Sequence, residues 1–216
     1  MDITNWSTYG AKMLDFSVGE ISVSNNYFFA PKGFFPVRYA GSHGMRDVSI
    51  TLEFTGTWAT CTQNASNLVK DLSAGSDILL PDGFWYYCVL LPGKAPKRKG
   101  FSYESQVFTL KGVRHAALVT STLSSDGTVS NTGNRETPVR LTISNVTEDI
   151  EVMGVTISDF TGTIVIDGIN GTVTAGGNNA FMYTDFTEFP KLQPGSNSIT
   201  VPSGVSLTIE FYPLWW

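Results

Sequence analysis

The last 28 residues decide the fold class: Phe189–Trp216 reads FPKLQPGSNSITVPSGVSLTIEFYPLWW. Apolar side chains alternate with Ser, Thr and Glu over its second half, at Val205, Leu207, Ile209 and Phe211. A period of two is the pattern of a β-strand with one buried face. Pro194-Gly195 and Pro202–Gly204 are turn sequences. The stretch therefore predicts a β-hairpin at the end of the chain.

The composition of the whole chain extends this prediction. Of 216 residues, 42% are hydrophobic and only 15% are charged, which is typical of a globular protein and not of a disordered one. Twenty-one glycines and ten prolines separate short runs rich in Val, Ile, Thr, Phe and Tyr. Because such runs form strands and such punctuation forms turns, we expect a mostly β protein.

Two further segments show clear periodicity. Residues 48–54 (VSITLEF) alternate apolar and polar side chains, which predicts another half-buried strand. In the segment ATCTQNASNLVKDLSAG the apolar positions follow a helical stripe instead: Cys61, Ala65, Leu68 and Leu72. We expect a helix over about 60–74 that Thr60 caps and Gly75 ends. Asn25-Asn26 is expected to form a turn between two strands.

A polar segment suggests where two domains join. Residues 124–134 contain much Ser, Asn and Gly and are expected to be a linker. The domains are then an N-terminal β domain with one helix over 1–123 and a C-terminal antiparallel β-sandwich over 135–216. Up to Leu123 there are 11 Lys/Arg and 9 Asp/Glu, and from Ser124 onward 3 and 10, so the halves carry +2 and −7.

Charge and hydropathy exclude several functional classes. The net charge is −5, whereas a nucleic-acid-binding protein is expected to present a basic surface. The N-terminus MDITNWSTYG lacks the basic and apolar regions of a secretory signal, and no apolar run approaches the roughly 18 residues that span a bilayer. We therefore expect a protein without membrane insertion, made in a cytoplasm, whose Cys61 and Cys88 are buried thiols.

No catalytic, cofactor-binding or metal-binding motif is present. Neither glycine-rich nucleotide-binding pattern nor the G-x-S-x-G nucleophile motif occurs. His43, His115 and the two cysteines stand at unrelated spacings, unlike a zinc site. We predict no catalytic residue, no cofactor and no metal, and thus no enzyme.

Two groups of charged residues leave alternatives open. Carboxylates on a β-sandwich could act as a glycosidase pair, with Glu148, Asp149, Glu151, Asp159 and Asp167 as the candidates. Asp167, however, stands in a hairpin-turn sequence where Asp is expected for turn chemistry. The segment KAPKRKG is a candidate interaction loop through Lys94, Lys97, Arg98 and Lys99, which could contact an acidic surface of another subunit.

The ending also resembles a known family. Phe189–Trp216 is similar to the C-terminal signature of the distal tail (Dit) proteins of long-tailed bacteriophages and related prophages, siphovirus-type tail components, whose form is F-P-x-L-x-P-G-x-N-x-I. The motif positions are Phe189, Pro190, Leu192, Pro194, Gly195, Asn197 and Ile199. GNRETPVRLTI (133–143) and TIVIDGINGTV (163–173) resemble the same domain, and residues 9–29 and 48–72 resemble the family's N-terminal strands and strand-to-helix step.

This resemblance implies a fold and a role. It implies an N-terminal domain that closes into a homohexameric ring at the tip of the tail tube and a galectin-like C-terminal sandwich that holds the adsorption apparatus. The implied partners are the tail tube protein and hub, lysin or receptor-binding proteins, and the implied location is the virion tail tip, after assembly in the cytoplasm of the bacterial host. The motif residues are expected to be structural, with Trp215 and Trp216 fastened to a protein surface. A carbohydrate-binding module that attaches to host glycans is the alternative.

Overall fold

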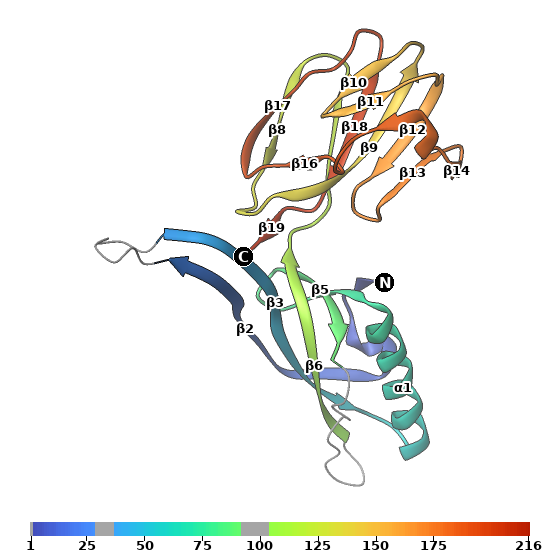
Figure 1. The fold of residues 1–216 in the computed structure, drawn as a ribbon. Helices are drawn as coiled ribbons and strands as arrows, with labels where there is room; N and C mark the ends of the chain where they lie inside the picture. Colours follow the sequence, from blue (N-terminus) through green and yellow to red (C-terminus); the bar gives the residue numbers. More distant parts are fainter. Residues whose placement is uncertain (1, 29–36, 92–103) are drawn as a thin grey trace. The chain divides into compact units, whose positions relative to one another are not determined.

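The computed structural model describes residues 2–28, 37–91 and 104–216 (Figure 1). The chain forms two compact domains. The N-terminal domain comprises the residues up to Arg114 together with Trp216, and the C-terminal domain comprises His115–Trp215. The domains therefore meet in sequence near residue 115, before the linker that composition suggests.

The N-terminal domain is a mixed sheet with one helix. Its elements are β1 (Asp2–Ile3), the 3-10 helix η1 (Trp6–Tyr9), β2 (Ala11–Phe28), β3 (Val37–Phe54), α1 (Trp58–Ala74), β4 (Ser76–Leu79), β5 (Trp85–Leu90) and β6 (Glu104–His115). The strand order is β1-β4-β5-β6-β3-β2. The β1–β4 pair is parallel, whereas β2–β3, β3–β6 and β4–β5 are antiparallel.

Helix α1 covers one face of this sheet, as its apolar stripe predicts. Cys61, Ala65, Leu68 and Leu72 are its buried residues, and they join a core built from alternate positions of β3, β5 and β6. The N-cap lies three residues earlier than predicted, at Thr57, whose hydroxyl accepts a hydrogen bond from the Thr60 backbone N–H. Gly75 ends the helix, as expected.

β2 and β3 are 18 residues each and form a long curved antiparallel ribbon (Figure 1). The turn expected at Asn25-Asn26 is wrong, because both residues lie inside β2 and oppose Gly41 and Ala40 of β3. The strand forms despite the local turn sequence, because pairing with β3 gives hydrogen-bond partners to the backbone N–H and C=O groups of the segment.

The C-terminal domain consists of short strands. They are β7 (Val119–Leu123), β8 (Gly127–Asn131), β9 (Thr137–Val146), β10 (Ile150–Val152), β11 (Val155–Ile157), β12 (Gly162–Asp167), β13 (Thr172–Ala175), β14 (Asn178–Asn179), β15 (Thr184–Asp185), β16 (Lys191–Leu192), β17 (Gly195–Ile199), β18 (Ser206–Phe211) and β19 (Leu214–Trp215), with the 3-10 helix η2 at Phe181–Tyr183. The largest sheet has the order β14-β13-β12-β9-β18-β7, with β16 beside β9, and smaller sheets are β10-β11-β15 and β17-β8. The hairpin expected at the end of the chain is wrong, because β17 pairs with β8 whereas β18 pairs with β9 and β7.

One apolar core joins these sheets. In β18 the residues Leu207, Ile209 and Phe211 are fully buried, and Ser206, Thr208 and Glu210 between them are not, as the period of two predicts. Core residues also come from both smaller sheets, including Val129 of β8 and Val155 of β11. The predicted class, mostly β with one α-helix in the described part of the chain, is confirmed.

The expected linker at 124–134 is instead part of the C-terminal domain. Its residues include β8, which pairs along its full length with β17 from Gly127↔Ile199 to Asn131↔Gly195. Val129 is buried in the core, and Asp126 accepts a hydrogen bond from the Val201 backbone N–H. The segment looks like a linker in sequence because a short strand on a two-stranded sheet needs few apolar side chains.

The end of the chain is fastened, as expected. Leu214 forms a bridge with Arg135, and the carbonyl of Pro213 accepts a hydrogen bond from the Ala116 N–H. Trp215 and Trp216 are half-buried, and Arg114 donates a hydrogen bond to the Trp216 backbone oxygen. In the described residues, no helix has the length and hydropathy required to span a membrane.

Candidate interaction sites

Asn197 closes the turn of the family motif. Its side-chain oxygen accepts a hydrogen bond from the Gln193 N–H at 2.9 Å. Its amide nitrogen donates to the carbonyls of Gln193 at 2.9 Å, Gly195 at 3.0 Å and Val129 at 3.4 Å. Gly195 has φ 87°, a left-handed conformation that favours glycine. One amide therefore holds the 193–197 turn and ties it to β8.

The first half of the motif fixes β16 to the domain. Leu192 is fully buried and opposes Thr137 of β9. The Pro190 carbonyl accepts a hydrogen bond from the Val139 N–H at 3.2 Å, and Phe189 packs against the core. Pro194 stands between these two halves. We propose that the motif is structural, since its side chains form the hydrogen bonds of the turn and pack against the core.

Replacing Asn197 by alanine should destabilise the C-terminal domain by about 2 kcal/mol, because several hydrogen bonds are lost and turn carbonyls lose their partner. Chemical denaturation of the full chain measures this loss. The matched control is Ser198→Ala, an exposed neighbour on the same strand, which should change stability by less than about 0.5 kcal/mol. Equal effects from the two substitutions would contradict the role given to Asn197.

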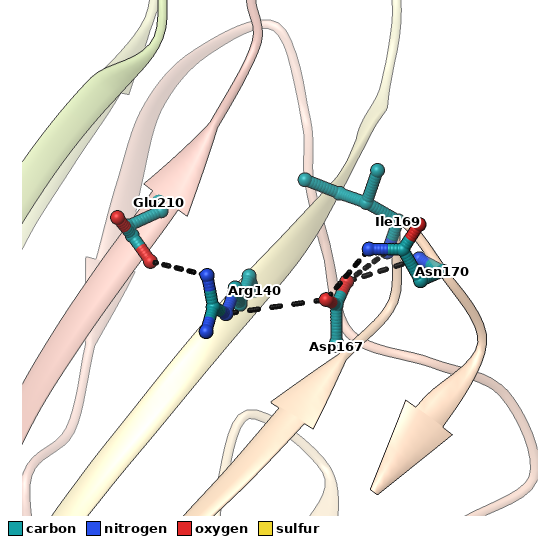
Figure 2. A network of polar contacts seen from close by, with 5 residues as sticks. All are labelled: Arg140, Asp167, Ile169, Asn170 and Glu210. Atoms are coloured by element: carbon teal, nitrogen blue, oxygen red, sulfur yellow. Dashed lines mark hydrogen bonds and ion pairs between the residues drawn. The ribbon is translucent and has the colours of Figure 1, made fainter. Parts of the chain in front are cut away.

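A charged row crosses the outer face of the largest sheet (Figure 2). Glu210, Arg140 and Asp167 stand opposite one another on β18, β9 and β12. The Arg140 guanidinium lies 3.6 Å from Glu210 through Nη1 and 3.9 Å from Asp167 through Nε. The arginine is therefore held between two carboxylates while part of its side chain stays exposed.

Asp167 also performs the turn chemistry that its sequence context predicts. Its Oδ1 accepts hydrogen bonds from the backbone N–H groups of Ile169 and Asn170, each at 3.0 Å, and its Oδ2 accepts one from the Asn170 side chain at 2.8 Å (Figure 2). These contacts fix the β12–β13 hairpin. The Asp167 carboxylate is thus hydrogen-bonded within the turn and paired with Arg140. These contacts do not favour a role for Asp167 as a glycosidase acid.

The other glycosidase candidates gather around the small sheet β10-β11-β15. Glu148, Asp149, Glu151 and Asp159 are exposed. Asp159 has φ 55°, and its backbone N–H donates to the Asp149 carboxylate at 3.1 Å. The structure therefore brings Asp149 and Asp159 together as partners in a loop contact.

The predicted basic loop and the metal candidates add no site to the described structure. Lys94, Lys97, Arg98 and Lys99 lie outside the described residues. In the part of the chain that is described, no group of three or more His, Cys, Asp or Glu could hold a metal ion. Both cysteines are buried and free, as predicted.

Two features were missed by the sequence reasoning. The first is the β-arm, defined as residues 22–28 of β2 and 37–45 of β3. β6 pairs with β3 only between Arg46 and Phe54, so within the described residues the β-arm pairs only with itself. Seven residues of strand extend about 20 Å. The sequence would have predicted the β-arm only if Asn25-Asn26 had been assigned to one continuous strand.

The second missed feature is a cluster of ring side chains after β14. Phe186 and Phe189 have ring centroids 4.9 Å apart, and Phe181 lies 6.1 Å from each. These residues follow neither the helical nor the strand period in sequence. Irregular chain between short strands brings them together, so periodicity could not predict the cluster.

Comparison with known proteins agrees with the resemblance. Residues 128–215 match the family model SPP1_Dit, described as the siphovirus-type tail component, C-terminal domain. The match begins inside the segment expected to be a linker. No curated protein sequence matches the chain significantly.

Solved structures share the fold over nearly the whole chain. The crystal structure of the SPP1 Dit (gp 19.1) protein, titled a paradigm of hub adsorption apparatus in Gram-positive infecting phages, has a TM-score of 0.65 at 13% identity, covering 97% of this chain and 95% of that one. The phage P2 baseplate in its activated conformation with Ca contains a chain with a TM-score of 0.55 at 12% identity, covering 93% and 90%. The resemblance to siphovirus-type Dit tail components is thereby confirmed, by sequence over residues 128–215 and by fold over nearly the whole chain.

Proposed function

We propose that this chain is a structural protein of a phage or prophage tail, a hub that forms a homohexameric ring at the distal end of the tail tube and joins the tube to the baseplate or adsorption apparatus. The observation that carries the proposal is the tail-component match over residues 128–215, together with a fold similar to the SPP1 Dit protein along 97% of the chain. The role is structural and not enzymatic.

The N-terminal domain offers edges suited to ring closure. β2 is an outer strand of its sheet, and β3 has no second neighbour along the β-arm within the described residues. Unpaired strand edges present rows of N–H and C=O groups that pair readily with another chain. Because the β2 edge and the β-arm edge of β3 are different surfaces, pairing one with the other between copies is head-to-tail, and head-to-tail contacts generate a ring when the rotation between copies closes.

The C-terminal domain, in this proposal, is the galectin-like module that carries the adsorption proteins. The partners are the tail tube protein on one side and hub, lysin or receptor-binding proteins on the other, in a virion tail tip assembled in the host cytoplasm. The charge difference between the halves, +2 against −7, suits two different sets of contacts.

The purified protein should form a particle of six copies, and six times 23.5 kDa is about 141 kDa. Mass measurement across a concentration series, with negative-stain images, checks this expectation, and the images should show a ring with a central hole. A monomer at all concentrations, both alone and mixed with the tail tube protein, would contradict the ring.

A carbohydrate-binding module remains the alternative. The exposed part of Arg140 and the hydroxyls of Thr142 and Thr208 on the same sheet face are groups that could bind sugar hydroxyls. A glycan array separates the two functions. Specific glycan binding by a protein that never forms rings would favour the alternative.

A further inference from the structure

The ring cluster of the C-terminal domain continues to the protein surface. We name Phe181, Met182, Phe186 and Phe189 the aromatic patch. Phe186 and Phe189 pack against the core and are half-buried, so they form its base. Phe181 is 41% exposed and Met182 is 83% exposed. Core packing explains the base but not the two exposed side chains, and clustered exposed apolar groups are a mark of interaction sites.

The segment that presents these side chains is held in place by hydrogen bonds. The Phe181 N–H donates to the Asn179 side chain at 3.0 Å, and the Thr184 hydroxyl donates to the Phe181 carbonyl at 3.0 Å. The Tyr183 N–H donates to the Ala180 carbonyl, and its own carbonyl accepts from the Ser158 N–H. A fixed segment loses little conformational entropy when a partner binds. The aromatic patch is therefore a preorganised surface.

The segment that carries the aromatic patch also carries carboxylates. Asp185 and Glu188 are exposed in the same segment. Asp185 stands in a row with Thr156 and Glu151 across the sheet β15-β11-β10. Glu188 pairs with Lys191 at 2.9 Å, so Asp185 and Glu151 supply the charge that is left. A partner that covers the patch and reaches Asp185 is therefore favoured by positive charge at its edge.

We propose that the aromatic patch docks a second tail protein whose contact surface has an aliphatic or aromatic centre and a rim of Lys and Arg. Met182 enters the apolar centre of that surface, and Asp185 faces its basic rim. Met and Phe side chains suit such a contact because they bury large apolar area and adapt to the partner's shape. This inference rests on the proposed function, and it assigns the contact to a defined surface of the C-terminal domain.

Site-specific photo-crosslinking in intact tails tests the proposal. A photoreactive amino acid replaces Met182 in the full chain, and tails are purified from the phage or prophage that encodes it. We expect cross-links to a different tail protein, within a peptide that contains apolar residues next to Lys or Arg. The matched control places the same amino acid at Thr120, an exposed position on β7 at the opposite edge of the largest sheet, where the yield should be at least fivefold lower.

A second variant tests the rim. Asp185→Lys reverses one charge beside the patch, and its side chain makes no core contact because it is exposed. The cross-link yield at position 182 should fall at least fivefold with this change, and also when tails are irradiated after exposure to high salt. A yield unchanged by the charge reversal would overturn the basic rim.

The remaining outcomes are equally decisive. Cross-links to another copy of this chain, to an acidic peptide, or with a yield no higher than at Thr120 would overturn the docking surface while leaving the tail-hub function in place. If the unmodified chain is missing from purified tails, the proposed function itself fails and the inference fails with it. Presence of the chain in tails thus separates the two failures.

Discussion

Replacing Phe211 by alanine should destabilise the C-terminal domain by about 3–5 kcal/mol, the range for a fully buried Phe truncated in a well-packed core. Phe211 has 0% exposure and stands between Val139 of β9 and Val119 of β7 in the largest sheet. The surrounding strands can relax only partly into the space, because β18 is paired on both sides. Denaturant unfolding with hydrogen exchange at β9 and β18 measures the loss.

The control for this prediction lies on the same strand. Thr208 points to the opposite face of β18, where its hydroxyl lies 3.2 Å from that of Thr122. Thr208→Ala should cost less than about 1 kcal/mol, the scale of one cross-strand pair. If Phe211→Ala were no more damaging than Thr208→Ala, the buried face assigned to β18 would be wrong.

Sequence periodicity predicted the elements that bury one face. The alternation in β18 and in residues 48–54 of β3, and the stripe of α1, all reappear as buried side chains in the structure. These patterns can be read from sequence because the strand and helix periods follow from local backbone geometry. The observed N-cap, Thr57, lies three residues before the predicted one, Thr60, because both threonines are good caps and the helical stripe does not distinguish them.

Features set by distant pairing were not predictable in this way. Asn25-Asn26 has the composition of a turn and residues 124–134 that of a linker. In the structure, pairing with β3 places Asn25-Asn26 in β2, and pairing with β17 makes part of 124–134 the strand β8. The family motif was found by resemblance, but the four hydrogen bonds of Asn197 depend on where β8 lies. The aromatic patch arises from irregular chain, and the charged row of Glu210, Arg140 and Asp167 arises from strand register. Neither feature follows a periodic pattern in the sequence.

Cys88 in the native protein should react with a thiol reagent about a thousandfold more slowly than in the unfolded chain. Burial in the N-terminal core, and then the nearby charge of Asp77, raise the pKa of the Cys88 thiol from 9.0 to about 12. Only the thiolate is nucleophilic, and each pKa unit lowers its fraction tenfold at neutral pH. Labelling of the native protein at pH 8, followed by peptide mass analysis and compared with labelling in denaturant, measures the ratio.

The control is Ser66→Cys, which places a thiol on the exposed side of α1, where it should label at the rate of the unfolded chain. Rapid native labelling of Cys88, or a disulfide between Cys61 and Cys88, would contradict the buried thiol.

The same raised pKa makes Cys88 contribute to the pH dependence of stability. Below about pH 9 Cys88 is protonated in both the folded and the unfolded states, so this thiol does not destabilise the fold there. As the pH rises from about 9 towards 12, the unfolded thiol loses its proton first, and unfolding becomes progressively more favourable. Native labelling in that range should therefore accelerate through opening of the N-terminal domain. Cys88→Ala, which has no proton to lose, should remove this part of the alkaline destabilisation and leave the part due to every other group. Tyr9 is one such group, because its pKa is also raised, to about 12. The difference between the two proteins therefore measures the effect of the Cys88 thiol alone.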